Sequence, residues 1–240
     1  MALTDNLISY YALDSNGNDS LGTNNMTEAN ITYVTGKIAN AASFNGSTSQ
    51  MRNGNITLPA WNSPYSINFW VKLNAEIASS SWWLAMLAPD GTNQDTQYTM
   101  SYQYNWWTRR LALEHYYNWP ETYYPLYHNV TLGTSNWNMI TMTYTGSVIN
   151  IYFNWTLVTT WWWTGTYWSS WPQTYQKGIT IWSLYYSSAY GNRSNAIIDE
   201  FWYWDREIIS TEISTLYNSW SWLAYPFSTW ATFIPKITFL

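Results

Sequence analysis

Residues 137–158 read WNMITMTYTGSVINIYFNWTLV, and this stretch predicts the fold class. Three short runs rich in β-branched and aromatic residues are separated by two turn signals, at Thr145-Gly146 and at Asn154-Trp155. Strand, tight turn and strand in succession are typical of an antiparallel β-meander. We therefore expect a chain built from antiparallel sheets.

The second of these turns carries an unusual residue. A two-residue hairpin turn needs positive φ at both central positions, which is why Asn-Gly is favoured there. Trp155 stands where glycine is expected, and Trp161–163 follow in a segment that also reads as a turn. Because a Cβ atom makes positive φ unfavourable, these tryptophans need an explanation.

Length and charge restrict the class of protein. The chain has 240 residues, which suits one large all-β domain. Only 10% of the residues are charged, the net charge is −5 and no Lys/Arg run occurs, so we expect no nucleic-acid partner and a surface of Ser, Thr, Asn and Tyr. We expect no membrane span, because no apolar segment is long enough, and no signal peptide, because MALTDNLISYYALD lacks a basic and an apolar region. Cysteine is absent, which excludes disulfides and thiol catalysis.

Short β-rich runs recur along most of the chain. YSINFWVKL, residues 65–73, places Ile67, Phe69 and Val71 on one face and polar residues and Trp70 on the other. A short helix is expected at 211–217, with Ile213, Leu216 and Tyr217 on its apolar side. The pattern predicts an all-β, antiparallel β-sandwich with one short helix near the C-terminus. The strands that we predict are 7–13, 31–34, 40–45, 65–73, 83–88, 97–104, 110–116, 122–131, 137–144, 147–154, 156–160, 178–184 and 196–204.

Four blocks of sequence carry a family resemblance. They are LISYYALDSNGNDSLGTNN with TYVTGKIANAASFNGS, then YSINFWVKL, then SNWNMITMTYTGSVINIYFNWTLV, and last IIDEFWYWDREIISTEISTLYNS. In this order they resemble the LamG-like jelly-roll domain of the concanavalin A-like lectin/glucanase superfamily. The opening MALTDNLISYYALD is also similar to members found in bacteriophage structural proteins. The resemblance implies a jelly roll over residues 1–227 and a C-terminal tail over residues 228–240.

Several tryptophans depart from the family pattern, because they stand where such domains have glycine or another small residue. Two explanations are open: exposed aromatic loops, or a UGA codon read as Trp in the sequence but as Gly in the source organism. Gly is only 11 of 240 residues while Trp is 20, which favours the second. The positions concerned are Trp155, Trp182, Trp202, Trp220 and Trp222.

Catalysis is not expected. Glucanases of this superfamily use the motif E-x-D-x-x-E, which brings two carboxyls to about 5–5.5 Å for retaining hydrolysis. No such motif occurs here. The acidic residues Asp199 and Glu200 are adjacent in a predicted strand, so we expect them to point to opposite faces.

The resemblance also implies a metal candidate. Some relatives hold calcium with oxygen ligands from the loop after the first strand and from the last strand. Asp14, Asn18, Asp19 and Asp199 could supply hard oxygen ligands of the kind that Ca²⁺ prefers. The alternative is a turn rich in Asn and Asp that binds no metal.

Carbohydrate binding is the activity that the family most often performs. The segment RRLALEHYYNWPETYYPLYH supplies aromatic rings for stacking on sugars and polar groups for their hydroxyls. If these side chains share one rim, they would form a glycan platform; alternatively, the tyrosines pack across strands or form a protein interface. The candidate residues are Arg109, Arg110, Glu114, Tyr116, Tyr117, Tyr123 and Tyr124.

These observations favour a non-catalytic, glycan-binding or host-attachment protein on a virion or extracellular surface. The alternative is a purely structural virion protein, a capsid decoration or fibre subunit. In that alternative the tail TWATFIPKITFL, residues 229–240, adds a strand to a neighbouring subunit. The tryptophans at glycine-like positions are left out of the predicted site.

Overall fold

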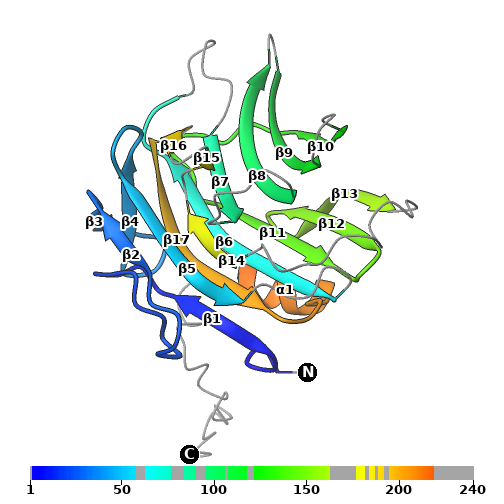
Figure 1. Cartoon of the computed structure of the whole chain (residues 1–240), viewed down its shortest axis with the longest axis horizontal. Helices are drawn as coiled ribbons and strands as arrows, with labels where there is room; N and C mark the ends of the chain where they lie inside the picture. The colour runs from blue at the N-terminus through cyan, green and yellow to red at the C-terminus, as the bar shows by residue number, and fades with distance from the viewer. Residues whose placement is uncertain are drawn as a thin grey trace, which may run out of the picture.

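The computed structural model describes residues 2–57, 63–76, 84–89, 96–105, 108–117, 122–162, 177–181, 184–186, 189–191 and 195–218. These residues form two large antiparallel sheets with a short helix, α1 (Ser210–Asn218), near the end of the described chain (Figure 1). The all-β, antiparallel β-sandwich with one short helix is thus confirmed. Residues 219–240, with the predicted tail, lie outside the described residues, so the domain boundary at 227 stays a prediction. None of the described helices is long and apolar enough to cross a membrane.

The first sheet has eight strands and contains the first and the last of the described strands. β11, β12 and β13 are consecutive in it and form the predicted meander. In sheet order the strands are β13 (Thr156–Trp162), β12 (Val148–Phe153), β11 (Asn138–Tyr144), β6 (Tyr65–Leu73), β17 (Asn195–Trp204), β4 (Asn40–Asn45) and β3 (Thr32–Thr35), with β1 (Leu7–Tyr11) also paired to β17.

The second sheet has seven strands. Its order is β10 (Thr122–Asn129), β9 (Thr108–Tyr117), β8 (Thr96–Asn105), β7 (Leu84–Pro89), β14 (Lys177–Ile181), β5 (Gln50–Thr57) and β2 (Thr27–Ala29). A separate two-stranded ribbon joins β15 (Leu184–Tyr186) and β16 (Ala189–Gly191). The sequence pattern missed β2, β5, β15 and β16, because their residues do not alternate between apolar and polar.

The two faces of β6 follow the predicted alternation. Ile67, Phe69 and Val71 belong to the core between the sheets. Trp70 belongs instead to a second cluster on the other face of the eight-stranded sheet, where Ile213 and Leu216 of α1 cover it. Both faces of this sheet are therefore buried at its centre, and the helix covers the outer one.

Strand β17 pairs with two different strands along one edge. Residues 195–198 pair with β4, and residues 201–204 pair with β1. The ladder to β6 is irregular between Asp199 and Trp202, and Glu200 has φ of 53°. A β-bulge thus lies where β4 gives way to β1.

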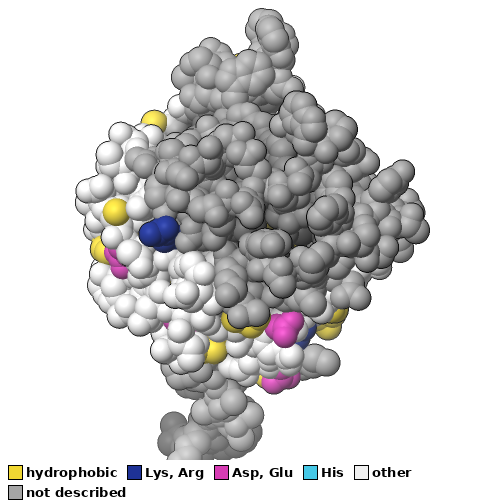
Figure 2. Space-filling model, in the orientation of Figure 1, with side chains coloured by type: hydrophobic (Ala, Val, Ile, Leu, Met, Phe, Trp, Pro, Cys, Tyr) yellow, Lys and Arg dark blue, Asp and Glu magenta, His cyan; other side chains and the backbone are white. Residues whose placement is uncertain are grey.

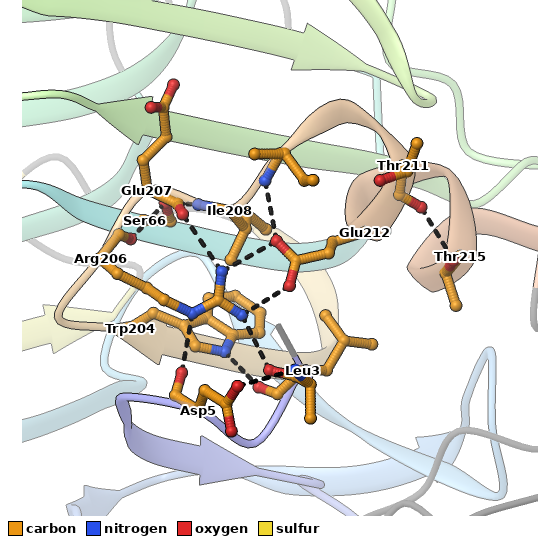
Figure 3. A network of polar contacts seen from close by, with 12 residues as sticks. Leu3, Asp5, Ser66, Trp204, Arg206, Glu207, Ile208, Thr211, Glu212 and Thr215 are labelled. Carbon is orange, nitrogen blue, oxygen red and sulfur yellow. Dashed lines mark hydrogen bonds and ion pairs between the residues drawn. The ribbon is translucent and has the colours of Figure 1, made fainter.

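The first and last parts of the described chain meet at Arg206 (Figure 3). Its guanidinium donates to both oxygens of Glu212, at 2.8 and 2.7 Å, and to the backbone oxygens of Asp5 and Ala2, at 2.8 and 3.0 Å. Glu212 Oε2 also accepts from Ile209 N, so the same carboxylate holds the start of α1. This buried, bidentate pair fastens residues 2–5 to the helix.

The turn at Asn154-Trp155 has the conformation that the hairpin requires. Asn154 has φ of 48° and Trp155 has φ of 68°, and the Trp155 side chain is 50% exposed. Trp155 therefore occupies a left-handed conformation that favours glycine.

Other tryptophans behave differently. Trp202 is 2% exposed and stacks on Tyr10, with ring centroids 3.8 Å apart, and on Trp204, with centroids 5.7 Å apart. Trp161 and Trp162 belong to β13, where they pair with Ile149 and Val148, so the prediction of a turn there is wrong for these two. Trp163, Trp182, Trp220 and Trp222 lie outside the described residues.

Glycine at position 155 should give a more stable protein than alanine at the same position. We expect Trp155→Gly to raise the free energy of unfolding by about 1 kcal/mol over Trp155→Ala, because only the left-handed strain separates the two variants. Chemical denaturation of both variants measures this difference. Trp202→Gly is the contrasting change and should lower stability by about 3 kcal/mol or more, since it empties a buried aromatic stack. Equal stabilities of the two variants at 155 would contradict the strain argument.

Candidate ligand-binding site

The predicted platform lies on β8, β9 and β10. β8 and β9 run together to the top of the view in Figure 1, and β10 pairs with the outer edge of β9. The backbone register sets Tyr116 opposite Tyr123 and Glu114 opposite Pro125. The side chains of Glu114, Tyr116, Tyr117, Tyr123 and Tyr124 lie outside what the structure describes, so their part in the platform stays a prediction.

Arg110 is the best-defined polar group on this part of the sheet. Its Nε and Nη2 donate to Gln103 Oε1 at 3.1 and 3.0 Å. Gln103 Nε2 in turn donates to Ser101 Oγ at 3.1 Å, which fixes the orientation of the amide. The guanidinium carbon of Arg110 lies 3.4 Å from the centre of the Tyr127 ring. We call Arg110, Gln103, Tyr127 and Asn129 the arginine cluster.

Alternation along the strands explains why these residues meet. Arg110 stands opposite Gln103 on β8 and opposite Asn129 on β10, and Tyr127 is two residues from Asn129. Residues directly opposite or two apart on a strand share a face. Gln103 is 3% exposed, whereas Arg110 and Tyr127 are half-buried and Asn129 is exposed. The cluster is therefore a supported polar surface with a ring and an amide beside the cation.

Arg109 does not belong to this surface. It stands opposite Tyr104, which packs against the core between the sheets, and its Nη2 lies 3.2 Å from Glu76 Oε2. Arg109 and Arg110 therefore lie on opposite faces of β9, because consecutive residues of a strand point to opposite faces. Ligand binding at Arg109 stays a prediction.

The metal candidates near the N-terminus are engaged in turns. Asp19 is buried, and its carboxylate accepts the backbone N–H groups of Tyr10, Leu21, Thr23 and Asn24. The backbone N–H of Asn18 donates to Asn16 Oδ1 at 2.9 Å. These contacts are those of an Asx-rich turn. A cation at Asp19 would compete with these four N–H donors.

The other two metal candidates also accept backbone hydrogen bonds. Asp14 Oδ1 accepts from Asn40 N at 2.9 Å, and Asp199 Oδ2 accepts from Lys37 N at 2.7 Å and from Ile38 N at 2.9 Å. Within the described ranges, no group of three or more His, Cys, Asp or Glu is placed to hold a metal ion. Calcium binding at Asp14, Asn18, Asp19 and Asp199 stays a prediction.

Asp199 and Glu200 form a buried carboxyl pair that sequence reasoning missed. Ile198 and Phe201 both belong to the core between the sheets, so the bulge leaves Asp199 and Glu200 together on the other side of β17. They are 0% and 3% exposed. The expectation that they point to opposite faces is wrong, because it assumed a regular strand. The composition of the strand carried no signal of a bulge.

The surroundings of this pair favour the neutral form of both carboxyls. Burial raises the pKa of Glu200 to about 9, with a further rise from Asp199 beside it. Burial likewise raises the pKa of Asp199 to about 7, against the lowering effect of the N–H groups of Ile38 and Lys37. Tyr10 Oη donates to Glu200 Oε2 at 2.6 Å. Because both carboxyls are enclosed, a glycosidic bond cannot reach them, and they serve the fold.

The comparisons with known proteins support the fold. No protein-family profile and no curated protein matches the sequence. Solved structures do match: the binding domain of botulinum neurotoxin D/C in complex with rat synaptotagmin II has a TM-score of 0.70 at 15% identity, covering 92% of this chain and 53% of that one. A structure of botulinum neurotoxin type C, whose cell entry is described as dependent upon interaction with two ganglioside molecules, has a TM-score of 0.68 at 17% identity. The match covers 90% of this chain and 52% of that one.

A third similar structure comes from a bacterial enzyme. Domain 4 of an extracellular GH43 arabinanase from Geobacillus stearothermophilus, in complex with arabinotriose, has a TM-score of 0.64 at 16% identity, covering 88% of this chain and 97% of that domain. This chain spans about half the length of the neurotoxin chains that it matches. At these identities the likeness establishes a shared β-sandwich fold.

The carboxyl pair should make stability depend on pH. The folded protein retains protons on Glu200 that the unfolded chain releases above its ordinary pKa of 4.5, so stability should fall as the pH rises from about 5 to about 9. Thermal unfolding at several pH values measures this. We expect Glu200→Gln to flatten the dependence, because the amide cannot ionise. Asp205→Asn, at an exposed position on the same strand end, should keep the wild-type slope. An equally steep slope in Glu200→Gln would exclude Glu200 as its source.

Proposed function

We propose that this chain is a non-catalytic carbohydrate-binding module and that the arginine cluster is its binding surface. The observation that carries this proposal is the fixed Arg110 guanidinium stacked on Tyr127 with an exposed amide, Asn129, beside it. Aromatic rings stack on the C–H faces of sugars, while arginine and asparagine bind their hydroxyls. The similar fold of a domain solved with arabinotriose supports the same assignment.

The surface composition agrees with this role. On the face drawn in Figure 2, the described surface is mostly uncharged, with a few separated acidic and basic side chains. Such a surface offers hydroxyl and amide groups to a sugar and gives no extended field for a polyanion. We further propose that the module acts on a virion or other extracellular surface in host attachment, as the resemblance to LamG-like phage proteins implies.

A structural role is the second candidate. The tail at 228–240 combines apolar and β-branched residues and would add a strand to a sheet edge of another subunit. In that case the chain is a capsid decoration or fibre subunit, assembled through the tail, that binds no glycan.

A glycan microarray followed by calorimetry tests the proposed function. We expect binding to at least one glycan and a loss of about fivefold in affinity for Tyr127→Ala, because the variant removes the ring that holds Arg110 in place, a contact worth about 1 kcal/mol. Trp155→Ala, an exposed aromatic residue on the other sheet, should bind as the wild type does. No released sugar should appear on prolonged incubation. Absence of binding across the array would leave the structural role as the better proposal.

We also propose that position 155 is glycine in the natural protein and that a UGA codon is decoded there as glycine. The left-handed conformation of Trp155 supports this, whereas the buried, stacked Trp202 favours tryptophan at its own position. Intact mass and peptide mapping of the protein from its native source measure the residue at each site. We expect the Trp–Gly mass difference at 155, and an unshifted peptide there would refute the decoding proposal.

A further inference from the structure

Arg110 is a fixed cation without an acidic partner in the described structure. Arg109 pairs with Glu76, and Arg206 pairs with Glu212. No described carboxylate lies within ion-pair distance of Arg110, whose partners are the neutral Gln103 and the Tyr127 ring. A half-buried guanidinium that is neutralised by no described residue is well suited to an anion from outside.

The hydrogen bonds leave a particular edge of this guanidinium open. Gln103 takes hydrogens from Nε and Nη2, on the side of the group that faces β8. The edge formed by Nη1 and the second hydrogen of Nη2 has no partner among the described residues. Two parallel N–H groups on one edge match the two oxygens of a carboxylate and bind it in a bidentate way. The contacts to Gln103 and Tyr127 hold the group in place beforehand, so little entropy is lost on binding.

The surroundings match a sugar that carries such a carboxylate. The Tyr127 ring holds the guanidinium of Arg110, and Asn129, opposite Arg110, supplies an exposed amide for the hydroxyls of the sugar. The protein as a whole has a net charge of −5. One cation on an acidic protein favours a single carboxylate and disfavours a polyanion, which needs a row of cations.

We propose that the arginine cluster recognises a carboxylate-bearing sugar residue, a sialic or uronic acid, through the open edge of Arg110. This proposal rests on the proposed carbohydrate-binding function and names its ligand class. In this arrangement Tyr127 holds the guanidinium, Asn129 binds hydroxyls of the sugar, and Arg110 selects the acid over the neutral sugar.

Calorimetric titrations with matched ligands test the proposal. The probes are 3′-sialyllactose and a digalacturonic acid, each compared with its methyl ester, together with lactose as a neutral sugar. We expect at least one acid to bind about tenfold or more tightly than its ester, since the ester keeps the sugar and removes the charge. Which of the two acids binds more tightly than its ester distinguishes sialic from uronic acid as the ligand.

Variants locate the effect. Arg110→Gln should abolish the preference for the acid, and Arg110→Lys should reduce it, because an ammonium keeps the charge but not the bidentate geometry. Lys72→Gln removes one positive charge from the other sheet, where Lys72 lies over Trp137, and should keep the preference. The comparison of acid with ester uses the wild-type protein, so it holds even if an Arg110 variant fails to fold.

The outcomes separate the two proposals. Equal affinity for acid and ester, or binding of neutral glycans alone, would overturn the acidic ligand class and leave the carbohydrate-binding function standing. A preference that Lys72→Gln loses as fully as Arg110→Gln would trace the effect to net charge and also overturn the assignment to Arg110. No binding of any glycan in the array and in these titrations would overturn both.

Discussion

The rest of the structure depends on the pairing of one edge of β17 first with β4 and then with β1. One strand pairs with two others in succession, and the bulge at Asp199 and Glu200 marks the change of partner. The bulge leaves two carboxyls in the interior, where Asp199 bonds the loop before β4 and Glu200 bonds Tyr10 of β1. A β carbon at Gly36 in that loop would lie 2.6 Å from Asp199 Oδ2, so the loop can approach only because glycine is there. Two strands remote in sequence are thus joined through one buried pair.

Tryptophan plays different parts in the same sheet. Trp202 and Trp204 form a buried stack with Tyr10, and Trp70 lies under α1. Trp155 instead stands exposed at a turn whose geometry favours glycine. The abundance of tryptophan alone would suggest a sugar-stacking platform. Burial and backbone conformation show that these residues either build the outer core or strain a hairpin, and the proposed binding surface lies on the other sheet.

On the proposed binding surface, buried polar residues hold Arg110 in a fixed orientation. Ser101 orients Gln103, and Gln103 holds Arg110 against Tyr127, so the cation is fixed before any ligand arrives. Preorganised groups lose little entropy on binding, which lets a small number of contacts give specificity. Arg109, one residue away, forms an ion pair with Glu76. Because side chains alternate along a strand, the two neighbouring arginines lie on opposite faces of β9 and have different partners.

The sequence by itself determined the β-sandwich class, the meander, the buried face of β6 and the apolar side of α1, because alternation and helical periodicity are local properties of the chain. It also located the strained turn at Trp155, since the requirement for positive φ belongs to the turn itself. Only the tertiary structure decided that the polar run QMRNGNIT is a strand, because β5 exists by pairing with β14 and β2. The same holds for the Asp199–Glu200 pair and for the contacts of Arg110, which arise where strands distant in sequence meet. Such long-range pairing leaves no periodic trace in the residues that it brings together.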